Sequence, residues 1–154
     1  MSEELAYLAG LIDGEGYISI NRQTNRATRR GVHYHPVVKL ANTDFDMPRL
    51  FLERFGGVMD TRRYDATHPK WSDSLCWSVT TRNLVEPCLR QLLPYLRTKK
   101  RQAEIALLFC ERPNGKAGKG GGGVMSDAEF ALREDLYLQA RALNRRGRPP
   151  ATTE

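Results

Sequence analysis

A single carboxylate, Glu15, follows a segment whose apolar spacing predicts a helix over residues 3–13. The C-terminal end of a helix carries partial negative charge from the helix dipole, so an anion there is electrostatically unfavourable. A bound divalent cation would remove this penalty, because carboxylate oxygens are ligands that Mg²⁺ prefers. Glu15 is therefore a candidate metal ligand, and the structural alternative is a plain surface carboxylate.

Two small residues, Ala6 and Gly10, lie four positions apart in the same segment. Small residues at this spacing allow two helices to approach closely. Glycine lowers helix stability, so Gly10 within a helix indicates a packing role. A dimer that pairs two such helices would bring Glu15 and its symmetry mate together.

Residues 8–16 read LAGLIDGEG and are followed directly by a strand-like segment. This string resembles the LAGLIDADG signature of homing endonucleases, from which it differs only at Gly14 and Glu15. In that family the motif helices form the interface between two αββαββα units, and the last acidic residue of each motif binds the catalytic metal. The chain carries one motif, so it resembles the single-motif, homodimeric branch. The implied interface residues are Ala6, Leu8, Ala9, Gly10, Ile12 and Asp13, with Asp13 interpreted as structural at the helix end rather than as a metal ligand.

The segment at residues 93–108 resembles the part of the family that carries a basic active-site residue. Lys99 is the best match, and Lys100 and Arg97 compete with it. A lysine near the scissile phosphate can position the attacking water and offset developing charge. The resemblance also makes Asn42 a candidate to orient water, with Thr43 as an alternative. A surface or backbone-phosphate role for Lys99 and a helix-capping role for Asn42 stay open.

The elements that must position these residues are an alternation of helices and strand pairs. We expect helices at 3–13, 44–55, 83–95, 97–112 and 126–145, and strands at 17–23, 32–41, 58–65 and 74–81. This order predicts an α+β fold, αββαββα, with an antiparallel sheet, helices on one face, and additional C-terminal helices. We expect an endonuclease core at 1–112, a glycine-rich loop at 113–125, a helix of the same domain at 126–146 that Ser126 and Glu129 open as a capping box, and a disordered tail at 147–154.

Alternation along the strands separates a core face from an open face suited to the DNA major groove. The core set is Ile18, Ile20, Val38, Leu40, Trp77 and Val79. The candidate DNA-binding residues are Ser19, Asn21, Gln23, His33, His35, Lys39, Arg62, Tyr64, Ser74, Cys76 and Ser78, with Arg26, Arg29 and Arg30 as phosphate contacts in the first hairpin loop. A one-residue register slip would exchange the two faces.

The composition is that of a globular chain with a basic surface. The 154 residues are 40% hydrophobic and 27% charged, and the net charge is +6, so a dimer would carry 6 + 6 = +12. This charge favours a polyanionic partner such as double-stranded DNA, although an ordinary solvated basic surface also fits. The odd number of cysteines and their spacing indicate free thiols. With no signal-like or membrane-spanning segment, we expect an intracellular protein (bacterial or phage-infected cytoplasm, or an organelle matrix) that is not secreted.

Taken together, the resemblance implies a metal-dependent DNA endonuclease, encoded in an intron. It would cut a long pseudo-palindromic site with Mg²⁺, or alternatively Mn²⁺, leave short 3′ overhangs, and need no small-molecule cofactor or membrane. Two other functions occur on this type of fold. One is an RNA maturase that assists intron splicing, and the other is a regulator that binds DNA without cutting it.

Overall fold

The computed structural model describes residues 2–64, 67, 70–113 and 125–145. Its elements are α1 (Glu3–Glu15), β1 (Gly16–Thr24), β2 (Val32–Asn42), α2 (Asp46–Phe55), β3 (Val58–Arg62), β4 (Ser74–Val79), α3 (Arg82–Leu92), the 3₁₀ turn η1 (Leu93–Tyr95), α4 (Lys100–Cys110) and α5 (Asp127–Leu143). The predicted α+β class and the αββαββα order are both confirmed.

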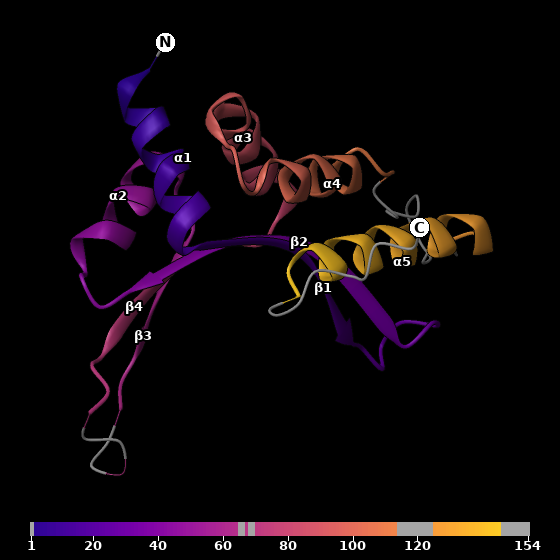
Figure 1. Ribbon diagram of the computed structural model, residues 1–154. Coiled ribbons are helices and arrows are strands. Elements are labelled where there is room, and N and C mark those ends of the chain that lie inside the picture. Colours follow the sequence, from indigo (N-terminus) through magenta and orange to yellow (C-terminus); the bar gives the residue numbers. More distant parts are fainter. Residues whose placement is uncertain (1, 65–66, 68–69, 114–124, 146–154) are drawn as a thin grey trace, which may run out of the picture.

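One four-stranded antiparallel sheet organises the molecule, in the order β1-β2-β4-β3. The helices lie on one side of it, and the sheet arches so that the two hairpins point away from them (Figure 1). The register pairs Ile18 with Val38, Val38 with Val79, and Leu40 with Trp77. All of these side chains are buried, so the predicted assignment of the two sheet faces is confirmed.

Helix α1 begins and ends where local chemistry dictates. The Ser2 hydroxyl accepts the Leu5 N–H at 3.2 Å, which satisfies one of the free donors of the first turn. At the other end Gly16 passes directly into β1. A Cβ on Gly16 would lie 2.7 Å from Ile12 Cδ1 and 2.8 Å from Ile12 Cα, so glycine is needed for this close turn.

Several helices and one strand are shorter than predicted. Helix α2 begins at Asp46 rather than at 44, because the Asn42 and Asp44 side chains accept the N–H groups of Asp44 and Asp46 in two successive turns. The strand expected at 58–65 ends at Arg62, and the helices expected at 83–95 and 97–112 are shorter, with η1 between them.

The C-terminal helix α5 packs against α4 and β1 and belongs to the same packed unit. Together they bury a second apolar cluster: Ile20, Tyr34, Ile105, Phe109, Leu136 and Ala140. The predicted capping box is only half correct. The Ser126 hydroxyl accepts the Glu129 N–H at 3.1 Å, but the Glu129 carboxylate binds Arg112 and Arg133 instead of reaching back to Ser126.

The predicted glycine-rich loop and tail fall mainly at 114–124 and 146–154, outside the described residues. All three cysteines are free, as expected. Within the part of the chain that the structure describes, no helix is both long and apolar enough to cross a bilayer.

Candidate active site

Glu15 is the last residue of α1 and lies where the helix meets the middle of the arched sheet (Figure 1). Its side chain is exposed, and no hydrogen bond or ion pair joins its carboxylate to any of the described residues. The last turn of α1 contains no basic residue. Both carboxylate oxygens are therefore available to a ligand from outside the chain.

Asp13, two residues earlier, is fully engaged inside the chain. Its carboxylate accepts the backbone N–H of Arg97 at 2.8 Å and of Lys99 at 3.0 Å, and the Thr98 hydroxyl at 3.1 Å. These bonds fasten the end of α1 to the turn that opens α4. The structural interpretation of Asp13 therefore agrees with the geometry, because its oxygens are occupied by donors of this turn.

Lys99 is brought to the same helix end. Its Nζ donates to the carbonyl oxygens of Ile12 at 2.9 Å and Asp13 at 2.6 Å. Burial lowers the pKa of Lys99, while the nearby Asp13 and Glu15 carboxylates act in the opposite direction. The competing candidates Arg97 and Lys100 are both exposed. Of the three, Lys99 is the one whose charged group is held beside the Glu15 helix end.

The described residues offer few metal ligands at this helix end. Among the described residues, no group of three or more His, Cys, Asp and Glu side chains could hold an ion. Glu15 offers one unoccupied carboxylate, and its chemistry fits a hard divalent cation.

Asn42 is not drawn into this site by any hydrogen bond to Glu15 or Lys99 in the described chain. Its side-chain oxygen accepts the Asp44 N–H at 2.8 Å in a turn that precedes α2, so Asn42 is not the cap of that helix either. Thr43 is exposed.

The two faces of α1 correct the expected interface. Leu8, Ala9 and Ile12 are each no more than 1% exposed and lie in the chain's own core, so they cannot pack against a partner helix. The opposite face is accessible and carries Ala6, Gly10 and, one turn later, Gly14. The prediction was wrong for Leu8, Ala9 and Ile12 because it assigned the whole motif to the interface. An amphipathic helix buries one face in its own core, so only the opposite face could contact a partner.

The predicted DNA-binding residues of the strands do lie on the open face of the sheet: Ser19, Asn21, Gln23, His33, His35, Lys39, Arg62, Ser74, Cys76 and Ser78. Ser19, however, is only 2% exposed. The His33 and His35 rings stack with centroids 6.0 Å apart, and burial together with the His33 charge lowers the pKa of His35. Tyr64 lies beyond the end of β3, with its ring 4.9 Å from that of Trp71.

Arg30 differs from the other two arginines of the first hairpin loop. Its guanidinium donates to the Met125 carbonyl at 2.8 Å and pairs with Asp127 at 2.6 Å, and it lies over the Phe130 ring. It therefore fastens the loop to α5. Arg26 and Arg29 are exposed and stay available for phosphate.

Asp60 is an open-face residue that the sequence analysis missed. It pairs with Cys76 in the register and is exposed, with no hydrogen bond or ion pair to a described residue. The same alternation that identified Arg62 in β3 would have identified it. The predicted set contained no acidic side chain, although a carboxylate can accept a hydrogen bond from cytosine.

No family model and no curated protein matches the sequence. Solved structures do match. The homing endonuclease I-CvuI in complex with a DNA target aligns with a TM-score of 0.73 at 18% identity, over 94% of this chain and 83% of that one. The group I intron-encoded homing endonuclease I-CeuI, also complexed with DNA, gives 0.59 at 18% identity over 72% and 55% of the two chains. The LAGLIDADG homing endonuclease I-GzeII gives 0.55 at 15% identity over 69% and 34%. The chain therefore has the fold of the LAGLIDADG homing endonucleases.

Proposed function

We propose that this protein is a site-specific DNA endonuclease that acts as a homodimer and uses a divalent metal ion to hydrolyse both strands of a long, pseudo-palindromic target. Structural neighbours crystallised with DNA and with Mg²⁺ or Ca²⁺ support the substrate and the type of cofactor. Mg²⁺ is the metal we expect, and short 3′ overhangs are the expected product.

The observation that carries the proposal is the unoccupied Glu15 carboxylate beside the Lys99 ammonium at one helix end. In a dimer that pairs the Ala6–Gly10–Gly14 face of α1, each chain would contribute one Glu15 to a metal site on the open side of the sheet. A metal bound there would stabilise the attacking and leaving oxygens of the phosphodiester.

Lys99 has a defined part in this chemistry. An ammonium has three donors, and the Ile12 and Asp13 carbonyls take two of them. The third donor can reach a phosphate oxygen or the attacking water. Since the amine is already held by the helix end, its positive charge is in place before negative charge develops on the phosphate.

The open sheet face supplies recognition. Asn21 and Gln23 carry amides suited to adenine, and Arg62 suits guanine. Arg26, Arg29 and the net charge of +6 provide attraction for the backbone.

The test is the variant Glu15→Gln, which keeps the shape of the side chain and removes its charge. A DNA site is first selected from a random duplex library by binding to the wild-type protein, and cleavage and binding are then measured with Mg²⁺. We expect cleavage to be abolished while binding is retained. Glu53→Gln, which alters an exposed carboxylate on α2, is the matched control and should cut normally. Cleavage by Glu15→Gln at the wild-type rate would refute the assignment.

A further inference from the structure

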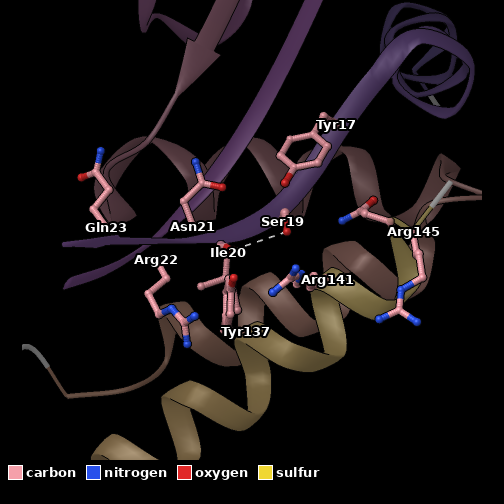
Figure 2. Close-up of a pocket in the computed structure, with 10 residues that line it drawn as sticks. Tyr17, Ser19, Ile20, Asn21, Arg22, Gln23, Tyr137, Arg141 and Arg145 are labelled. Carbon is pink, nitrogen blue, oxygen red and sulfur yellow. Dashed lines mark hydrogen bonds between the residues drawn. The ribbon is translucent and has the colours of Figure 1, made fainter. Parts of the chain in front are cut away.

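A groove of about 490 Å³ lies between β1 and α5 (Figure 2). One side is formed by Tyr17, Asn21 and their neighbours along β1, and the other by the C-terminal half of α5 with Arg141, followed by Arg145 just beyond the helix (Figure 2). Asn21 also belongs to the open face of the sheet, so the groove continues directly from the proposed DNA-binding surface.

The groove is positively charged. Arg141 lies in the last turn of α5 and Arg145 lies two residues beyond the end of the helix at Leu143, and neither guanidinium makes a hydrogen bond or ion pair with another described residue. Arg22, which also lines the groove, is different. It pairs with Glu134 at 2.6 Å and lies over the Tyr137 ring, so its charge is compensated. None of the described side chains that line the groove is acidic.

The edge of the sheet adds backbone donors. The Asn144 amide donates to the Ile18 carbonyl at 2.8 Å, so the backbone groups of Ile18 face the free edge of β1 rather than β2. Residues of a strand alternate in the side to which their backbone groups point, so the N–H of Ile20 faces the same edge inside the groove. Two guanidinium groups and an edge N–H are the donors that usually contact DNA phosphates.

We infer that this groove binds a phosphate of the DNA backbone, so that α5 extends the interface beyond the sheet. The inference rests on the proposed function, because it takes DNA as the ligand. Binding there reads no base. It would fix the duplex in register on β1, since the same strand presents Asn21 and Gln23 to the bases.

The test compares Arg141→Gln/Arg145→Gln with a control, Arg54→Gln/Arg90→Gln, which removes the same charge from α2 and α3 on the helix-covered side. Affinity for the selected duplex is measured by fluorescence anisotropy over a series of salt concentrations. Each lost phosphate contact should lower the slope of log affinity against log salt by about 0.9. The proposed dimer has two such grooves, with one phosphate in each. If both phosphate contacts are lost and the affinities of variant and wild type converge near 1 M salt, binding at 0.15 M should weaken roughly 30-fold.

Hydroxyl-radical footprinting adds a readout that a folding defect would not mimic. The double variant should lose protection of particular backbone positions, placed symmetrically about the centre of the site. A double variant that keeps the slope and footprint of the control would overturn the inference and leave the proposed function intact. A wild-type protein that binds no duplex at all would overturn both.

Discussion

Replacing Gly10 with leucine distinguishes the contribution of α1 to the stability of one chain from its contribution to the proposed dimer. A Cβ added at Gly10 meets no heavy atom within 4 Å, so a side chain fits freely in the single chain. Leucine is the better helix former, and the free energy of unfolding of the isolated chain should rise by about 0.7 kcal/mol. The same side chain would enter the proposed contact between two helices, where overpacking costs about 1–3 kcal/mol for each inserted group.

A two-fold interface contains the substitution twice, which makes the cost to the dimer about 2–6 kcal/mol. At about 1.4 kcal/mol for each factor of ten, the dimer dissociation constant should rise between about 30-fold and about 10⁴-fold. Sedimentation velocity over a dilution series measures this constant, and thermal unfolding of the dilute protein measures the opposite effect on the single chain. The reasoning fails if Gly10→Leu dimerises as tightly as the wild type.

Gly16→Ala is the matched control, because it changes a glycine of the same motif at a position where a Cβ does not fit. Its Cβ would lie 2.7 Å from Ile12 Cδ1 and 2.9 Å from the Ile12 carbonyl oxygen. It should therefore lower the melting temperature of the chain, the reverse of the effect expected for Gly10→Leu.

Three further predictions concern the active site, the attachment of α5 and base recognition. Lys99→Met should lower the cleavage rate at saturating DNA by about 100-fold or more and lower the free energy of unfolding by about 2 kcal/mol, whereas Lys100→Met, which alters an exposed neighbour, should do neither. Glu129→Gln should destabilise the fold by about 2 kcal/mol at neutral pH, measured by urea unfolding. Hydrogen bonds from Arg112 and Arg133 lower the Glu129 pKa from 4.5 to about 2, so its contribution is complete above pH 4.5 and lost as the pH falls toward 2; a difference from wild type that persisted at pH 2 would contradict this. Asp60→Asn should remove a preference for cytosine at one base pair of each half-site, worth about 1–3 kcal/mol, and a repeated site selection that returned the same cytosine would exclude this contact.

Local patterns were sufficient to predict the sheet and the residues on its core face. Alternation along β1 and β2 assigned the core face correctly, although Ser19 and Val37 on the opposite face are buried as well. The predicted end of the first helix at residue 13 was two residues too early, because α1 continues through Gly14 to Glu15. Each of these predictions depends on neighbours in sequence.

Contacts between distant segments account for what the sequence did not reveal. Arg30 pairs with Asp127, 97 residues away, and this contact removes it from the expected phosphate set. Arg22 likewise pairs with Glu134, 112 residues away. The carboxylate of Glu129 binds two arginines in place of its own helix start. A charged side chain has many possible partners in the sequence, and the tertiary structure determines which of them it contacts.

The Asp13 carboxylate ties the end of α1 to the turn before α4. In the proposed dimer, distances within one subunit are therefore set independently of the distance between the two subunits. The spacing of Glu15 and Lys99 is set within one subunit, and a small rotation of α1 carries both groups together. A change in how the two subunits of the proposed dimer dock would therefore alter only the distance between one Glu15–Lys99 pair and the other. The proposed dimer interface could therefore change during evolution, or be redesigned, without disturbing the Glu15 and Lys99 pair within each subunit.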